Sequence, residues 1–222
     1  ALANPNNLGA AQRAVDEGAK VVMAARSNGV TEQIEKANGG AAVAVTCDVR
    51  NEEDCARVVD TAIERFGRVT GLVNNAYAHP GFDDLLATPP AALGDALDVI
   101  VHGSLNMTRA AVPAMEAAGR GSIVNVGTMA TRDPMRTQAA YAVAKAAMAC
   151  ATRYLALELG EHGIRLNHAV PGWLDGPGVR FYLRFTAEQR GISEQEVYDE
   201  IASRNPLGRI PTDTACAGAI LM

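Results

Sequence analysis

The chain has 222 residues and a formal net charge of -5 at pH 7, with 48% hydrophobic and 20% charged residues. These values are ordinary for one globular domain, and an acidic balance without a basic cluster argues against a nucleic acid partner. No apolar run approaches the roughly 18 residues of a membrane span, so we expect a cytoplasmic protein that acts on a small molecule and not on a membrane.

Short apolar runs alternate with helical patterns along the chain. The predicted strands lie near residues 20–25, 42–47, 71–74, 122–126 and 165–170. Between them, stretches such as 52–66 and 140–160 carry apolar residues at helical spacing. The alternation predicts an α/β fold with a doubly wound parallel sheet and helices on both faces. We expect residues 1–222 to form a single domain.

Three of the predicted strands end in polar or glycine-rich turns. The third ends at Asn74, the fourth runs into Thr128, and the fifth is followed by Pro171 and Gly172. In an open α/β sheet, ligands bind outside the carboxyl ends of the strands. We therefore expect these turns to converge on one crevice.

Tyr141 and Lys145 lie four residues apart on the helix predicted after the fourth strand. Residues at this spacing share a helix face, so both head groups can meet one reacting atom. An ammonium beside a phenol favours the phenolate and lowers its pKa. The pair is therefore a candidate for general acid/base chemistry, although this spacing alone is also common on solvated helices.

From about residue 18 to 216, the chain resembles the short-chain dehydrogenase/reductase family, which has a Rossmann-like fold. The resemblance rests on Asp48-Val49, Asn74-Asn75-Ala76, the strand ending at Thr128, the Tyr141/Lys145 pair and Pro171-Gly172. It implies an NAD(P)-dependent oxidoreductase that interconverts an alcohol and a carbonyl by hydride transfer.

The resemblance also assigns roles to single residues. Tyr141 would be the general acid/base, Lys145 would lower its pKa and bind the nicotinamide ribose, and Thr128 would position the substrate oxygen. The implied dinucleotide site consists of Asn7, Leu8, Gly9, Arg26, Asp48, Val49, Asn74, Ala76, Tyr141, Lys145, Pro171 and Gly172. Because Arg26 follows the strand where NAD enzymes carry a carboxylate, NADP is slightly preferred over NAD.

Three positions depart from the family pattern. Ile100 stands where the family has a catalytic asparagine, Tyr77 replaces the glycine after Asn-Asn-Ala, and only Gly9 survives from the phosphate loop. Two alternatives therefore stay open. One is a dinucleotide-free lyase similar to the halohydrin dehalogenases, and the other is a noncatalytic homologue that binds a ligand.

Residues 171–211 leave the sheet and return, which suggests a lid over the substrate. Trp173, Phe181, Tyr182 and Phe185 would suit an apolar or ring-bearing substrate, or would pack the lid against its own domain or a neighbouring subunit.

The resemblance implies a homodimer or homotetramer built partly on the helices at 92–118 and 141–160. We expect the first and last strands of the sheet to be incomplete in this sequence. The scattered cysteines 47, 55, 150 and 216 predict reduced thiols and no metal site.

Overall fold

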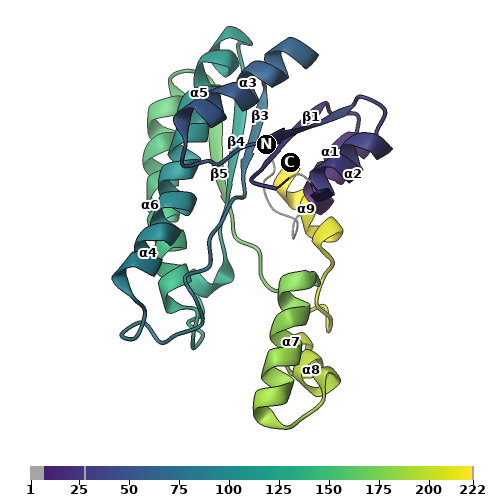
Figure 1. The fold of residues 1–222 in the computed structure, drawn as a ribbon, viewed down its shortest axis with the longest axis vertical. Coiled ribbons are helices and arrows are strands. Elements are labelled where there is room, and N and C mark those ends of the chain that lie inside the picture. The colour runs from purple at the N-terminus through teal and green to yellow at the C-terminus, as the bar shows by residue number, and fades with distance from the viewer. Residues whose placement is uncertain (1–7, 28, 222) are drawn as a thin grey trace.

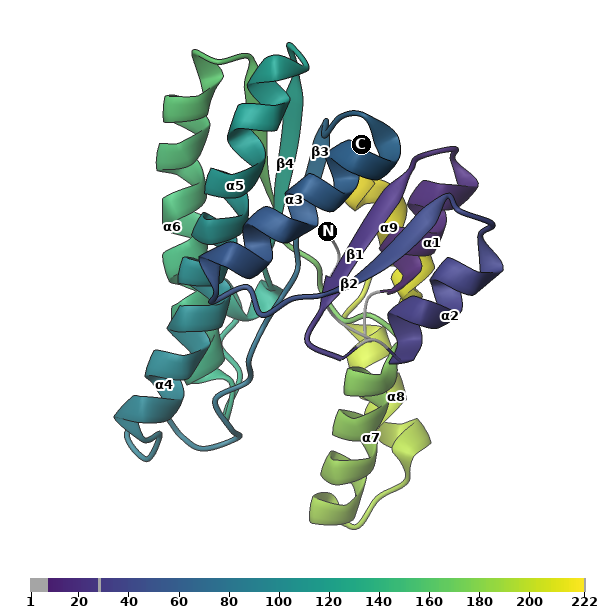
Figure 2. The same ribbon diagram turned by 45° about the horizontal axis from the view of Figure 1, so that its top comes forward.

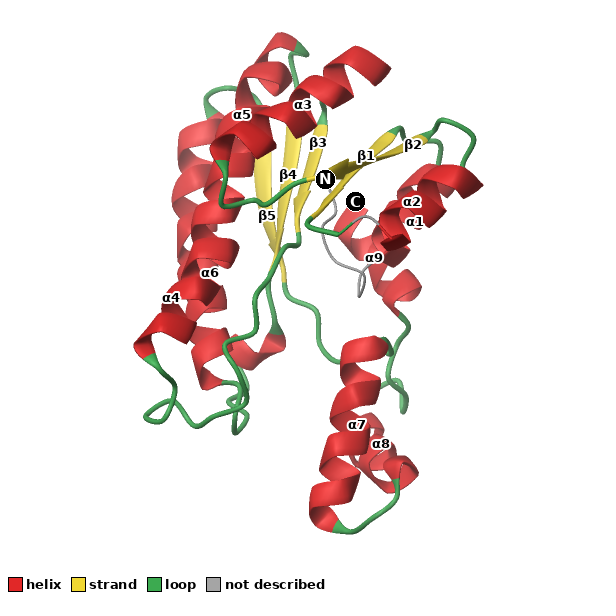
Figure 3. Ribbon diagram, in the orientation of Figure 1, coloured by secondary structure: helices red, strands yellow, loops and turns green. Residues whose placement is uncertain are grey.

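The computed structural model describes residues 8–27 and 29–221, and its elements follow the predicted alternation of strands and helices (Figure 1, Figure 3). The strands are β1 Val21–Ala25, β2 Ala42–Thr46, β3 Gly71–Asn74, β4 Gly121–Val126 and β5 Ile164–Ala169. Each strand lies within one residue of its predicted run, and every ladder between them is parallel.

The described strands form two groups. One ladder joins β1 to β2, and the other joins β3, β4 and β5 in that order. Between β1 and β3, which share no ladder in the described part of the chain, lies a cavity of about 250 Å³ lined by both strands. Figure 2 shows the β1–β2 pair turned relative to the other three strands. The first strand, which we expected to be incomplete, would fall on Ala1 and Leu2, and these residues lie outside the described part of the chain.

Helices cover both faces of the sheet (Figure 1, Figure 2). On one face lie α3 (Glu52–Phe66), α5 (Gly103–Ala117) and α6 (Ala139–Gly160). The other face carries α1 (Leu8–Asp16), α2 (Gly29–Ala37) and α9 (Asp213–Leu221). The α/β prediction with helices on both faces is confirmed.

Local sequence signals fix α3 at both ends. The Asn51 side chain accepts a hydrogen bond from the Asp54 backbone N–H, and acidic residues fill the first turn, where they complement the helix dipole. Gly67 ends the helix with a φ of 80°, a conformation that only glycine adopts easily, and its N–H donates to the Ile63 carbonyl. The buried side of this helix, with Cys55, Val58 and Val59, packs in the main core.

The helix predicted at 92–118 is interrupted. It consists of α4 (Pro90–Leu97), a π-helical segment Asp98–His102 and α5. The Gly103 N–H donates to the Asp98 carbonyl, which is the longer π-helical hydrogen bond. Such segments often occur at functional sites, and this one contains Ile100, which is buried.

Two helices, α7 (Pro177–Arg190) and α8 (Glu194–Ser203), project from the body in Figure 1. They bury Leu183, Ala187 and Val197 between them as a small core of their own. The two ends of this excursion meet, because Asp175 and Thr212 form a parallel bridge and the Asp175 N–H donates to the Pro211 carbonyl at 2.8 Å. The helix pair is therefore attached to the sheet through one narrow neck.

None of the helices in the described part of the chain combines the length and the apolar character that crossing a membrane requires.

We predict that Gly103→Ala destabilises the protein, because a Cβ atom there would lie 2.4 Å from Val49 Cγ2. Overpacking of this kind costs about 1–3 kcal/mol. The matched control is Gly94→Ala in α4, where a Cβ would meet nothing within 4 Å. That change should stabilise its helix by up to about 1 kcal/mol. Urea unfolding of both variants measures the difference, and equal midpoints would contradict the tight contact at Gly103.

Candidate active site

Lys145 is buried beneath the carboxyl end of β4. Its side chain is 3% exposed, and Nζ donates a hydrogen bond to the Val126 carbonyl at 2.6 Å. The same Nζ lies 5.9 Å from the centre of the Tyr141 ring. The bond anchors α6 to the end of β4 and thereby fixes the position of Tyr141, one helical turn earlier.

Thr128 and Tyr141 line the same cavity, and the Thr128 hydroxyl lowers the pKa of the Tyr141 phenol. Thr128 directly follows β4 and begins the short 3-10 turn Met129–Thr131, where its Oγ1 accepts from the Ala130 N–H at 3.3 Å. The strand end and the α6 helix thus place two hydroxyl groups on the wall of one cavity.

Burial is the main influence on the pKa values of both Tyr141 and Lys145. Burial, followed by the neighbouring Tyr77, raises the pKa of Tyr141 to about 12, and the bond to Thr128 opposes this only in part. Burial also lowers the pKa of Lys145 to about 8. Desolvation of the phenolate outweighs the hydrogen bond that favours it, and the lowering of the Tyr141 pKa by Lys145 stays a prediction.

A cavity of about 530 Å³ lies beside these residues. Thr128, Tyr141 and Lys145 line it together with Pro171 and Gly172 of the turn after β5. The Pro171 carbonyl accepts from the Met129 N–H at 2.9 Å, which ties this turn to the one after β4. The three predicted catalytic residues and the Pro-Gly turn therefore share one site.

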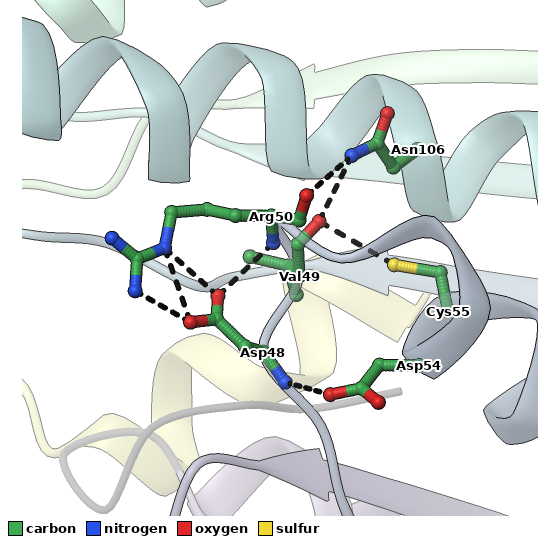
Figure 4. Close-up of polar contacts among 6 residues, drawn as sticks. All are labelled: Asp48, Val49, Arg50, Asp54, Cys55 and Asn106. Carbon is green, nitrogen blue, oxygen red and sulfur yellow. Dashed lines mark hydrogen bonds and ion pairs between the residues drawn. The ribbon is translucent and has the colours of Figure 1, made fainter.

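Asp48 belongs to a polar network at the end of β2 (Figure 4). The Arg50 guanidinium holds its carboxylate through Nε, at 3.0 and 3.1 Å from the two oxygens. This contact is the main reason that the pKa of Asp48 lies below its usual range. The Asp48 N–H donates to Asp54 Oδ2 at 2.8 Å. The carboxylate that we expected in the dinucleotide site is thus already paired with a cation of its own loop.

Asn106 supports the same loop, and our sequence reasoning assigned it no role. Its Nδ2 donates to the Val49 carbonyl at 3.2 Å, as Figure 4 shows. The spacing in the sequence could have indicated this role. Asn106 lies three residues after Gly103, so the two residues share the α5 face that packs against Val49.

Asn74 lies in a buried amide network and does not point into the large cavity. Its Nδ2 donates to Asn125 Oδ1 at 2.9 Å, and Asn125 in turn donates to Thr152 Oγ1 at 2.9 Å. These bonds connect β3, β4 and α6. Ala76, two residues on, packs against the main core.

The departures at Ile100 and Tyr77 meet in one apolar cluster. Ile100 packs with Ala144 and Met148 of α6, and the partly buried rings of Tyr77 and Tyr141 lie against this cluster. The Tyr77 and Tyr141 ring centres are 6.1 Å apart, edge to face. The space expected for an asparagine side chain is thus filled by hydrocarbon.

Two of the remaining predicted cofactor residues, Arg26 and Gly9, are described and do not line the large cavity. Arg26 is exposed directly after β1 and contributes to the low pKa of Asp48. At Gly9 in α1, a Cβ would lie 3.0 Å from Asp213 Oδ2 of α9, so helix packing alone accounts for this glycine. Asn7 lies outside the described residues, and Leu8 is described only as the first residue of α1.

His79 and Phe82 also belong to the cavity wall, although no motif in the sequence marks them as site residues. The His79 ring stacks on Tyr141 at 5.4 Å and on Phe82 at 4.3 Å between centres. Over residues 8–27 and 29–221, no group of three His, Cys, Asp or Glu is arranged to hold a metal ion.

We predict that Lys145 makes stability rise with pH. Between its folded pKa of about 8 and its ordinary value of 10.5, the unfolded chain holds a proton that the folded protein has lost. The free energy of unfolding therefore increases across this window, by about 2 kcal/mol from pH 8 to pH 10. Urea unfolding of wild type and Lys145→Met at both pH values tests this. If the free energy of unfolding changes equally in the two proteins between pH 8 and pH 10, the lowered pKa of Lys145 is contradicted.

Known proteins are similar to this chain over most of its length. A family model described as enoyl-(acyl carrier protein) reductase matches residues 7–222. Dehydrogenase/reductase SDR family member 4 of Oryctolagus cuniculus is 31% identical over 217 residues, which cover 96% of this chain and 80% of the relative. Across proteins of this name, the matched part spans 59% to 80% of the relative's length.

Two solved structures show the same fold with a nicotinamide dinucleotide. NAD+-bound xylitol dehydrogenase has a TM-score of 0.85 at 25% identity, with 96% of this chain and 85% of that chain covered. An actinorhodin polyketide ketoreductase with NADPH has a TM-score of 0.86 at 27% identity, with 96% and 83% covered. The family model and these relatives show that the chain belongs to the short-chain dehydrogenase/reductase family of oxidoreductases.

Proposed function

We propose that this protein is an NAD(P)-dependent oxidoreductase that interconverts an alcohol and a carbonyl compound. One observation carries the proposal: the hydroxyl groups of Thr128 and Tyr141 meet beside the buried Lys145, on the wall of a cavity of about 530 Å³. A site of this kind offers two hydroxyl donors for one substrate oxygen and an ammonium within the same helix turn.

The acidity of Tyr141 supports reduction of a carbonyl near neutral pH. With a pKa of about 12, the phenol is protonated and can donate its proton to the oxygen that gains charge. Thr128 donates a second hydrogen bond to that oxygen and holds it in place. The bound dinucleotide supplies the hydride. Lys145 binds the ribose in this proposal, and its positive charge in the bound state favours loss of the phenol proton.

The residues at the strand ends suit a dinucleotide that carries a 2′-phosphate. Arg26 is an exposed cation directly after β1. The Asp48 carboxylate nearby is paired with Arg50, so it repels an added phosphate less than a free carboxylate would. NADP is therefore the preferred cofactor in this proposal, with NAD as the second choice.

Two further parts of the proposal concern a substrate lid that includes α7 and α8, and a subunit interface on the exposed side of α6. Residues 171–211 act as a substrate lid, because Trp173, Phe181 and Tyr182 from this segment line the cavity. The chain forms a homodimer or homotetramer in which α6 buries Tyr154 and Leu157, which are 65% and 75% exposed in the single chain.

The dehalogenase-like lyase and the noncatalytic homologue, the two alternatives to an oxidoreductase, require different residues at the site. A dehalogenase-like site of this fold uses an arginine where this chain has Lys145, and a noncatalytic homologue has no need of a Thr128–Tyr141 pair. Titration with NADPH and with NADH, followed by nicotinamide fluorescence, tests the choice. Saturable binding, tighter for NADPH, supports the reductase. Absence of binding by both dinucleotides would overturn it in favour of the alternatives.

We predict that Tyr141→Phe lowers kcat for carbonyl reduction by a factor of about 100 to 10,000, the usual contribution of a positioned acid. Binding of NADPH should persist, since the aromatic ring and the fold remain. Tyr154→Phe on the same helix is the control, because it removes a hydroxyl outside the cavity and keeps the ring for the proposed subunit contact; it should leave turnover unchanged. Retention of activity by Tyr141→Phe would disprove the acid/base role.

We also predict that Arg26→Ser weakens binding of NADPH by about 10- to 100-fold, the worth of a hydrogen-bonded charge pair, and leaves binding of NADH within about twofold. The control is Arg68→Ser, another exposed arginine, which follows the distal end of α3. Fluorescence titrations of the three proteins give the dissociation constants. An equal loss for both dinucleotides would show that Arg26 does not read the 2′-phosphate.

A further inference from the structure

Gln138 lines the same cavity as Tyr141 and lies beside it in the structure. It directly precedes α6, and its carbonyl accepts from the Ala142 N–H at 2.8 Å. Tyr141 is three residues further along, a spacing at which two side chains at the start of a helix are neighbours. A group held by Gln138 therefore lies a few bonds from the oxygen that Tyr141 contacts in the proposed function.

One end of the Gln138 amide contacts the protein, and the other end is available to a ligand. The amide oxygen lies 3.1 Å from His79 Nε2, which is the sole side-chain hydrogen bond of Gln138 within residues 8–27 and 29–221. The amide nitrogen is not among the buried side-chain atoms that lack a partner, so it keeps exposed surface. A rotation of the amide by 180° exchanges its oxygen and nitrogen but leaves one of them accessible. A molecule in the cavity can therefore hydrogen-bond to Gln138 in either orientation.

The surroundings hold this amide in place. The His79 ring that it contacts is stacked between Tyr141 and Phe82, with ring centres 5.4 and 4.3 Å away. Thr137, the residue before Gln138, has a φ of 63°, a left-handed conformation that a β-branched residue rarely adopts. Strain of this kind persists only where the surrounding structure enforces it. The ring stack and the strained backbone together keep the amide at the cavity wall.

The cavity wall limits the kind of group that Gln138 can hold. Among the described residues that line it, Lys145 alone carries a full charge, and its Nζ is already bonded to the Val126 carbonyl. A carboxylate or phosphate would lose its hydration there without gaining a free cation. A hydroxyl group both donates and accepts, so it satisfies either orientation of the Gln138 amide. Much of the remaining wall is apolar and includes Phe82 and Trp173, which suit an apolar remainder of the ligand.

We propose that the substrate is an uncharged hydroxyketone, or the corresponding diol, and that Gln138 hydrogen-bonds to the hydroxyl group that does not react. The inference rests on the proposed function, since Tyr141 and Thr128 take the reacting oxygen. Gln138 is then a specificity-determining residue. Because Gln138 and Tyr141 are neighbours, this hydroxyl lies close to the reacting carbon. The apolar part of the substrate lies against Phe82 and Trp173.

Three alcohols with one framework test this proposal: 1-phenylpropan-1-ol, 1-phenylethane-1,2-diol and mandelate. They present a methyl group, a hydroxyl group or carboxylate oxygens at the same distance from the reacting carbon. Calorimetry measures their binding to the protein saturated with NADPH, where the alcohols cannot be oxidised because the cofactor is already reduced, and to the protein alone. We expect the diol to bind about tenfold tighter than phenylpropanol, and mandelate at least about tenfold weaker than the diol.

Variants of Gln138 assign the preference to its amide. Gln138→Met keeps the length of the side chain but removes the amide, so the diol and phenylpropanol should bind equally. Gln138→Glu keeps an acceptor for the hydroxyl, so the preference for the diol should persist while mandelate binds more weakly still. The control is Gln33→Met on α2, an exposed glutamine outside the cavity, which should match wild type. Circular dichroism confirms that each variant is folded.

Equal affinity of wild type for the diol and phenylpropanol, tighter binding of mandelate than of the diol, or a preference for the diol that survives in Gln138→Met would overturn the inference. Reduction of 2-hydroxy-1-phenylethanone and of propiophenone by NADPH tests the proposed function separately. Selective binding of the diol without reduction of either ketone sinks the proposed function and leaves the ligand class standing. Reduction of propiophenone without selective binding of the diol sinks the ligand class alone.

Discussion

The hydrogen bond from Lys145 Nζ to the Val126 carbonyl is the contact on which the site depends. It joins the first turns of α6 to the last residue of β4, and Thr128 follows two residues later on the same strand end. Because an ammonium buried to this degree needs a partner, the helix cannot slide along the sheet without leaving a charge unsatisfied. The relative position of the Thr128 and Tyr141 hydroxyl groups thus depends on a hydrogen bond in which neither hydroxyl takes part.

The alternation of strands and helices could be predicted from the sequence because each element carries its own signal. Buried parallel strands are continuous apolar runs, and α3 has an Asn51 cap at one end and Gly67 at the other. The π-helical segment at Asp98–His102 left no such signal, since its hydrogen bonds shift by one residue without any change in composition.

Pairs of site residues at fixed spacing could also be predicted, but their environment could not. Tyr141 and Lys145 share a face by helical geometry alone. The pKa of Tyr141 depends on how deeply α6, Tyr77 and the β4 turn enclose it, which is a property of tertiary packing. For the same reason, the sequence predicted Asp48 in the dinucleotide site but not its pairing with Arg50, and it did not predict the stack of His79 on Tyr141, which joins residues far apart in the sequence.

The bridge between Asp175 and Thr212 closes the α7–α8 excursion at its base, so the excursion can change in length without moving the sheet. Since both ends of the α7–α8 excursion meet there and the two helices bury a core of their own, the chain between them can lengthen, shorten or be replaced at little entropic cost to the sheet. In the proposed function, exchange of the excursion would therefore change which substrate is recognised, while the strand ends beside Thr128 and Tyr141 keep their geometry.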